Sequence, residues 1–423
     1  MRQIRRIPKR LAALICAAAL ALALLPVQAQ AAETAVYPVS ETWGNPLYPS
    51  LAAERAGSGT ALLSDGGMPS FDTAAQAADY INRQFRAREN MAFFYTGYPA
   101  DGPFLALTAD EESAAYDDEE QELVSHGASR ADILQRRQLM KYVRRLVTEE
   151  LLPEVFRYVP GDPTGGDYMR TQYRDVTCSA AYDGGILGVS VTFTYFTTAA
   201  QEAETDKAAA ELLDYLRLDG MTGYDRLTAI YDWICAHVAF DYAHQKDETY
   251  LAQYTAYGAL VDKAAVGQGY AALLYRLALA AGLDARIVTG TARGAAHHWC
   301  LLRMGERWYY ADAAWDAGSQ ARTYFLRPAL TYHVPDDASL AMAAQYPLAD
   351  SAYLLTPGDV NGDGFVNIQD VQALYAYLTL DRRPTGSGAL SAADFRSAAD
   401  VNNDGAADVY DLQRLYEMVT GLG

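Results

Sequence analysis

The stretch KAAVGQGYAALLYRLALAAGLDARIVTG, residues 263–290, decides the fold of the central part of the chain. Leu273, Leu274 and Leu277 recur at helical spacing, so we expect a helix from about residue 268 to residue 281. Gly282 suits the left-handed position that ends a helix, and a strand follows. The first turn of such a helix often holds a nucleophile, because the helix dipole favours negative charge there. The residue at this position is Gly267, which has no side chain.

The flanking segments predict alternating helices and strands. Two strands, HHWCLLR (297–303) and RWYYADAAW (307–315), surround a turn at Gly305. Helices are expected over residues 204–218 and 223–242, and amphipathic helices over 73–85 and 131–152. DVTCSAAY and GVSVTFTYF predict a hairpin around residues 183–185. The fold class indicated is α+β.

The N-terminus has the features of a secretory signal peptide. Five basic residues precede the apolar run 11–25, and Ala29-Gln30-Ala31 offers small residues for cleavage. The run is too short for a good transmembrane anchor. We therefore expect residues 1–31 to be removed and the mature protein to be secreted and extracellular, without a membrane anchor.

The charge of the mature chain limits its partners. The signal holds five basic and no acidic residues, so its removal leaves 29 basic against 53 acidic residues, a net charge of −24. Such an acidic surface argues against nucleic acid and anionic membranes, and it is compatible with calcium.

Two twelve-residue segments near the C-terminus predict calcium loops. DVNGDGFVNIQD begins at Asp359 and DVNNDGAADVYD begins at Asp400. Each has oxygen-bearing side chains at positions 1, 3, 5, 9 and 12 and glycine at position 6, as calcium loops require. We expect two Ca²⁺ ions. The predicted ligands are Asp359, Asn361, Asp363, the Phe365 carbonyl, Asn367 and Asp370, then Asp400, Asn402, Asp404, the Ala406 carbonyl, Asp408 and Asp411.

A helix is expected after each loop, and position 12 is Asp where an EF-hand has Glu. This duplicated, EF-hand-like unit resembles a type I dockerin. The resemblance implies a small all-α calcium-binding domain that binds a cohesin module of a scaffold protein, as in a cellulosome, often for polysaccharide catabolism. Many dockerins have Ser-Thr at loop positions 10 and 11, where they contact the cohesin. This chain has Ile368-Gln369 and Val409-Tyr410, and its loops begin 41 residues apart.

The segment 201–346 resembles the bacterial transglutaminase-like superfamily, which has a papain-like fold. The resemblance rests on AVGQGYAALLYRLALAAGLDARIVTGT, HHWCLL and ERWYYADAAWD. It implies a Cys-His-Asp triad, in which a thiolate attacks a carbonyl, His moves protons and Asp orients His. His297 and Asp312 match the base and the orienting residue, whereas Gly267 stands where the family has the cysteine.

No other thiol is well placed to replace the missing one. If His297 faces the groove, Cys300 faces away, because strand side chains alternate. Cys235 is expected on the buried face of its helix, and Cys178 lies in the earlier hairpin. An odd number of cysteines in the mature chain predicts no disulfide framework.

These patterns define five segments: signal peptide 1–31, an N-terminal α+β region 32–200, a transglutaminase-like core 201–350, a linker 351–357 and the dockerin 358–423. The function indicated is a pseudoenzyme that binds peptide, protein or glycan in the former active-site groove while docked to a cohesin. The alternatives are an amide hydrolase or acyltransferase with a variant nucleophile, and a structural module displayed by the dockerin.

Overall fold

The structure is a computed structural model. It describes residues 39–47, 69–96, 105–183, 186–244, 247, 249–319, 322–350, 352–353, 356–361, 366–384, 390 and 392–421. The predicted signal peptide and two predicted calcium ligands, Asp363 and Phe365, lie outside these residues. The chain divides into two compact units, one drawn from Met1–Arg157 and Tyr173–Tyr195, the other from Tyr158–Gln172 and Phe196–Gly423.

The first unit contains a five-stranded sheet with strand order β1-β4-β5-β3-β2, antiparallel except for the pair β2 and β3. Its elements are β1 (Val39–Gly44), β2 (Ser70–Phe71), α2 (Ala74–Arg86), β3 (Ala92–Thr96), α3 (Ala109–Ser113), α4 (Asp118–Ser125), α5 (Arg130–Arg145), a π-helical turn (Leu146–Leu151), α6 (Leu152–Val155), β4 (Tyr173–Asp183) and β5 (Ile186–Tyr195). The helices α2 and α5 and the β4–β5 hairpin confirm the sequence predictions for this region.

Aromatic packing joins α2 to the sheet of the first unit. Phe85 is fully buried, and its ring centroid lies 4.9 Å from that of Phe193 and 5.0 Å from that of Tyr195, edge-on in both cases. Edge-to-face pairs contribute about 0.5–1.5 kcal/mol beyond the area they bury. Phe85 therefore holds α2 against β5.

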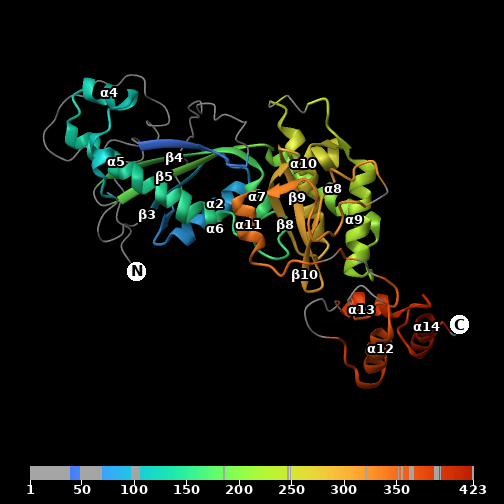
Figure 1. Cartoon of the computed structure of the whole chain (residues 1–423). Coiled ribbons are helices and arrows are strands. Elements are labelled where there is room, and N and C mark those ends of the chain that lie inside the picture. Colours follow the sequence, from blue (N-terminus) through green and yellow to red (C-terminus); the bar gives the residue numbers. More distant parts are fainter. Residues whose placement is uncertain are drawn as a thin grey trace, which may run out of the picture. The chain divides into compact units, whose positions relative to one another are not determined.

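The second unit is built on an antiparallel sheet of order β10-β9-β8-β11 with α10 packed across β8 and β9 (Figure 1). Its elements before the C-terminal domain are α7 (Asp167–Arg170), α8 (Ala199–Leu216), α9 (Gly223–His237), β6 (Ala239–Phe240), a 3₁₀ turn (Leu251–Tyr254), a π-helical turn (Gly258–Asp262), β7 (Ala264–Ala265), α10 (Gly267–Ala280), β8 (Ala285–Ala292), β9 (Ala295–Met304), β10 (Arg307–Ala311), β11 (His333–Pro335) and α11 (Asp337–Ala343). The predicted helix, the glycine stop and the three following strands are confirmed, except that the last strand ends at Ala311 instead of Trp315, and Gly282 has a φ of +75°.

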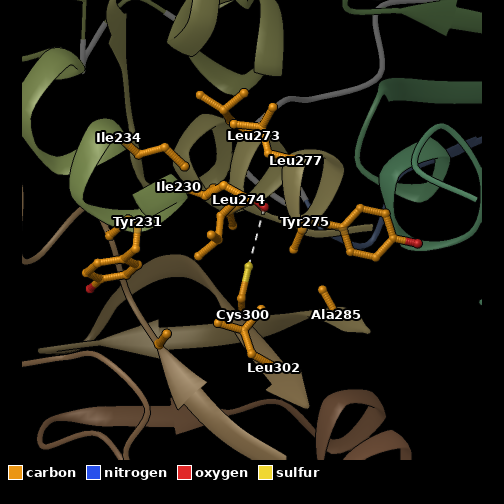
Figure 2. Packing of buried hydrophobic residues seen from close by; sticks show 14 of the residues in the cluster. Ile230, Tyr231, Ile234, Leu273, Leu274, Tyr275, Leu277, Ala285, Cys300 and Leu302 are labelled. Carbon is orange, nitrogen blue, oxygen red and sulfur yellow. Dashed lines mark hydrogen bonds between the residues drawn. The ribbon is translucent and has the colours of Figure 1, made fainter. Parts of the chain in front are cut away.

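Helix α10 is the centre of the core of the second unit. Leucines on different sides of the helix, among them Leu273, Leu274 and Leu277, are at most 1% exposed and pack with α9 and the sheet (Figure 2). Complete burial of such a side chain contributes about 1.5–3 kcal/mol. A helix that is apolar on all sides is stable only when other elements surround it, and this fixes the position of its first turn.

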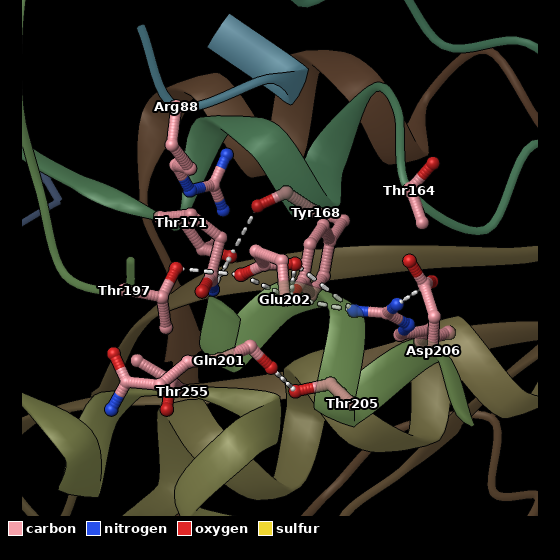
Figure 3. Close-up of polar contacts among 12 residues, drawn as sticks. Arg88, Thr164, Tyr168, Thr171, Thr197, Gln201, Glu202, Thr205, Asp206 and Thr255 are labelled. Carbon is pink, nitrogen blue, oxygen red and sulfur yellow. Dashed lines mark hydrogen bonds and ion pairs between the residues drawn. The ribbon is translucent and has the colours of Figure 1, made fainter. Parts of the chain in front are cut away.

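One charged residue, Arg276, lies in the middle of this apolar helix, with 2% of its side chain exposed. Its guanidinium donates to the Tyr168 hydroxyl (2.9 Å) and to the Glu202 carboxylate (3.2 Å), and it pairs with Asp206. Glu202 and Asp206 belong to α8 and Tyr168 to α7 (Figure 3). Because a buried charge is tolerated only when it is paired, this network ties α10 to both helices.

In the described residues of the C-terminal domain, the helices are α12 (Ile368–Leu380), α13 (Ala392–Ala399) and α14 (Val409–Thr420). Helices α12 and α14 lie side by side and confirm the predicted helix after each loop. Helix α13 was not predicted, because it lies in the segment between the repeats. Phe395 of α13 fills the small core with Leu374 and Leu415, so this segment completes the domain.

Candidate functional site

A buried contact between a histidine and an aspartate joins β9 to the residue that follows β10 in the second unit. The Nε2 atom of His297, near the start of β9, lies 2.7 Å from Oδ2 of Asp312, the residue that follows β10. The His297 side chain is 10% exposed and that of Asp312 is 1% exposed. The two residues that the sequence places in the base and orienting positions are therefore in direct contact.

Asp312 is held by both of its carboxylate oxygens. Oδ1 accepts the backbone N–H groups of Ala314 (2.9 Å) and Trp315 (3.2 Å), whereas Oδ2 faces histidine. Burial alone would raise the pKa of Asp312, but hydrogen bonds from the histidines hold it below its ordinary value. The carboxylate is thus ionised and fixed in orientation.

A second histidine, His333, contacts the same oxygen and was missed by the sequence analysis. It is the first residue of β11, and its Nε2 lies 2.8 Å from Oδ2 of Asp312. Its Nδ1 lies 2.9 Å from the carbonyl oxygen of Thr331. The segment TYHVP carries no motif, and His333 reaches the site only because β11 pairs with β8. No signal in the sequence would have found it.

Aromatic rings surround His333, whose side chain is 2% exposed. The ring centroids of Trp315, Trp299 and Tyr324 lie 4.5, 5.0 and 6.0 Å from that of His333. His297 lies at the edge of this group, 6.1 Å from both Trp299 and Trp315. The rings exclude water from the His333 side of Asp312.

His298, the neighbour of His297, is buried, and burial lowers its pKa to about 3. It is therefore neutral at ordinary pH. The structure separates the adjacent histidines: His297 contacts the carboxylate and His298 lies in the protein interior.

Gly267 is the first residue of α10, and the His297 ring lies against it. A Cβ atom built on Gly267 would be 2.3 Å from Cε1 and 2.4 Å from Nδ1 of His297. These distances are shorter than van der Waals contact allows. The φ angle of Gly267 lies outside the left-handed region, so the backbone itself would accept a side chain. The imidazole occupies the space that a side chain at residue 267 would need.

The three cysteines that the structure describes are free and buried. The Cys300 thiol donates to the Ala271 carbonyl oxygen of α10 at 3.4 Å, so it faces the core, as alternation along the strand predicts (Figure 2). Burial raises the pKa of Cys235 to about 12, and it raises the pKa of Cys300 and Cys178 as well. A thiol with a raised pKa is a poor nucleophile at neutral pH.

A cavity of about 760 Å³ adjoins the pair through Trp315. Its lining includes Phe240, Tyr242, Arg293 and Tyr324. The Arg293 guanidinium lies 5.0 Å from the centroid of the Trp315 ring, within cation–π range. An aromatic cavity with one cation is suited to sugars and peptides, because rings stack on flat apolar faces and the guanidinium fixes a polar group.

The two predicted calcium loops share one hydrogen-bond pattern in the residues that the structure describes. Asp411 accepts the backbone N–H groups of Asn402 (3.0 Å) and Asp408 (2.9 Å). Asp370 accepts those of Asn361 (3.0 Å) and Asn367 (2.9 Å) in the same way. The last residue of each loop thus closes the loop against the start of the following helix. Both carboxylates are fully buried.

In the second loop, carboxylate oxygens of Asp400, Asp404 and Asp411 all lie within 4.8 Å of one another. Gly405 has a φ of +91°, which the sharp turn in such a loop requires. Three carboxylates this close repel one another unless a cation lies between them. Carboxylate oxygens are hard ligands of the kind that Ca²⁺ binds. In the first loop, Asp359 is 3% exposed and Asp370 is fully buried.

Two family models match parts of the chain: the transglutaminase-like superfamily at residues 210–313 and the dockerin type I domain at residues 357–420. The human protein kyphoscoliosis peptidase is 25% identical over 131 residues, which are 28% of this chain and 20% of that protein. The chain therefore spans about one fifth of the length of this relative.

A solved structure described as a crystal structure of a TGase is 12% identical, covers 55% of this chain and 56% of its own, and has a TM-score of 0.24. Among the described residues, no helix combines the length and apolar character that crossing a membrane requires. Dockerins bind calcium and cohesin modules, and proteins that carry them are typically extracellular or on the cell surface. The chain combines an α+β transglutaminase-like core with a C-terminal type I dockerin domain.

Proposed function

We propose that this is a secreted, extracellular protein that docks to a cohesin scaffold and has lost thiol catalysis in its transglutaminase-like core. The observation that carries the proposal is the contact between His297 and Gly267, because the space for a nucleophilic side chain is taken by the base itself. Loss of the nucleophile from a comparable triad costs on the order of 10⁶ in rate.

The core then acts as the binding component of a docked assembly. The cavity beside Trp315 supports this role, since its aromatic rings would hold a peptide, a protein segment or a glycan without covalent chemistry. A polysaccharide-degrading complex is the setting that we favour. In the dockerin, we propose two Ca²⁺ ions, one bound by each loop.

Docking would use the exposed residues at loop positions 10 and 11. Val409 is 63% exposed and Tyr410 is 67% exposed in the second loop, and Ile368 is 47% exposed in the first. Apolar and aromatic side chains are the usual anchors of protein interfaces, so these residues replace the Ser-Thr pairs of other dockerins with a more apolar contact.

The test is calorimetric titration of the full chain with a panel of purified type I cohesin modules, with calcium and with chelator. Tyr410→Ala should weaken binding about 30-fold, corresponding to the roughly 2 kcal/mol of an interface hot spot. Tyr215→Ala is the matched control, because Tyr215 is also exposed, at 74%, but lies on α8. Equal affinity with chelator present would contradict calcium-dependent docking.

The retained pair of His297 and Asp312 favours one alternative, an amide hydrolase or acyltransferase with a variant nucleophile. A fluorescent electrophilic thiol probe separates the two readings. Covalent labelling that disappears in His297→Ala would support the enzyme. Absence of labelling in the native protein is expected for the binding protein.

A further inference from the structure

Three side-chain atoms of metal-ligand type converge beside the start of α10. Nε2 of His297 and Nε2 of His333 both contact Oδ2 of Asp312, and one ligand atom from each of the three residues lies within 4.8 Å of the other two. We propose that they form a binding site for one divalent transition-metal ion of the Zn²⁺ type. Two imidazoles and one carboxylate are a donor set that Zn²⁺ takes in proteins, and three protein ligands leave a coordination position for water.

The hydrogen bonds of His333 fix which of its ring nitrogens faces the carboxylate. The Thr331 carbonyl can only accept, so Nδ1 of His333 carries the hydrogen of that 2.9 Å contact. Nε2 of the same ring is then the atom that faces Oδ2 of Asp312, 2.8 Å away. A metal ion held by the Asp312 oxygen would be within reach of this nitrogen.

The surrounding groups resemble those that orient metal ligands. A metal-binding histidine commonly donates its other N–H to a carbonyl, as His333 does to Thr331. A metal-binding carboxylate is itself hydrogen-bonded, as Asp312 is through Oδ1 to the amides of Ala314 and Trp315. Oδ2 remains turned toward the histidines.

Metal binding requires a small adjustment of distances. Zinc ligands lie about 2.0–2.2 Å from the ion, which places tetrahedral ligand atoms about 3.4 Å apart. The present N–O distances are 2.7 and 2.8 Å. A shift of His297, whose side chain is 10% exposed, lengthens the first distance, and the second must lengthen between Asp312 and His333, whose side chains are 1% and 2% exposed.

The donor set also separates this site from the dockerin loops. Calcium takes hard oxygen ligands, which the loops supply, whereas imidazole nitrogen favours Zn²⁺ and similar ions. The protein would therefore bind two kinds of cation in two different places. This inference does not depend on cohesin docking or on the loss of thiol catalysis.

The experiment is a Zn²⁺ titration of the full-length protein in a large excess of Ca²⁺, which keeps the dockerin loops occupied. We expect one Zn²⁺ per chain. His297→Ala and His333→Ala should each weaken binding by at least about 100-fold, because each removes a ligand. His126→Ala is the matched control and should bind as the native protein does, since His126 directly follows α4 in the first unit and is exposed.

X-ray absorption of the native protein loaded with Zn²⁺ gives a second reading that does not depend on how the variants fold. Two imidazole nitrogens and a carboxylate oxygen at about 2.0–2.2 Å are expected. The proposal is wrong if no Zn²⁺ binds in excess Ca²⁺, if both histidine variants bind as tightly as the control, or if the absorption spectrum shows oxygen ligands alone.

Discussion

The imidazole of His297 lies where the side chain of residue 267 would begin, 2.3 Å from the position of a Cβ on Gly267. This contact joins the first turn of α10 to the start of β9. It means that glycine at residue 267 and the hydrogen bond from His297 to Asp312 depend on each other. A side chain at residue 267 can be accommodated only if the histidine ring moves.

Gly267→Cys tests whether the pair retains its chemistry. The thiol would lie at a helix N-terminus beside a histidine, and both lower a cysteine pKa below about 8.5. Once the ring has moved aside, we expect alkylation below about pH 8.5 to be faster than that of a free cysteine and to depend on His297. The measurement is the rate of iodoacetamide reaction against pH, with and without His297→Ala. A rate equal to that of free cysteine in both proteins would make the pair a packing contact only.

Gly267→Ala and Gly269→Ala should differ in stability, although both glycines lie in the first turn of α10. The neighbour of Gly267 is the end of one movable ring, whereas a Cβ on Gly269 would meet the carbonyl oxygens of Gln253 and Thr255 at 2.9 Å. Backbone atoms yield less easily than a side chain. We expect Gly269→Ala to lower the free energy of unfolding by about 1–3 kcal/mol and Gly267→Ala by less, measured by urea unfolding.

The cysteines that the structure describes should not be reactive in the native protein. Cys178, Cys235 and Cys300 are buried, and burial raises the pKa of each. Iodoacetamide at pH 7.5, below about 8.5 where a free cysteine ionises, should label the protein only after denaturation. Mass spectrometry of the alkylated native and denatured proteins is the measurement. Rapid labelling of a single cysteine in the native state would support the alternative of an enzyme with a variant nucleophile.

The dockerin domain should fold only with calcium. Asp400, Asp404 and Asp411 repel one another without a cation, and a domain of this size buries too little to offset that. Calcium at 100 times its dissociation constant adds about 2.7 kcal/mol to stability. Calorimetry of residues 358–423 should show a transition that chelator abolishes. Asp404→Ala and Asp363→Ala should each weaken one loop and leave the other intact. A melting curve that chelator leaves unchanged would contradict this.

Asp167 should make stability depend on acid pH. It lies in α7 with a side chain 3% exposed, and it accepts from the Arg286 guanidinium (2.7 Å) and from the Ile287 backbone N–H (2.9 Å). Burial raises its pKa, but Arg170 and Arg286 outweigh burial and hold the pKa below its ordinary value. Its contribution is therefore full above about pH 4, the unfolded value, and is lost as the pH falls through the lower native value.

Asp167→Asn removes this contribution while keeping the size of the side chain. We expect a loss of about 3 kcal/mol at pH 7, typical of a buried pair that loses one partner, and a smaller difference from the native protein at pH 3. Urea unfolding of both proteins at each pH is the measurement. Because only the difference is compared, the titration of the calcium-loop carboxylates cancels. A difference that is the same at both pH values would exclude Asp167 as its source.

The sequence by itself determined the features that have a local period or a fixed spacing. The spacing of Leu273, Leu274 and Leu277 predicted α10, and its Gly282 stop followed from the φ that only glycine adopts readily. Two segments with oxygen-bearing residues at the same five positions predicted calcium loops, because such a loop is encoded in twelve consecutive residues, and their duplication gave the resemblance to a dockerin. Alternation along β9 predicted that Cys300 faces the core.

Only the tertiary structure decided which residues from distant segments of the chain contact one another. His333 lies 21 residues beyond Asp312 in a segment without a motif. It reaches the carboxylate because β11 pairs with β8 on the side opposite to β9. The contact of the His297 ring with Gly267 likewise depends on how α10 crosses the strands. Phe395 and α13 complete a core whose other members come from both repeats. Such contacts arise from packing between distant segments, and a local pattern of residues carries no record of them.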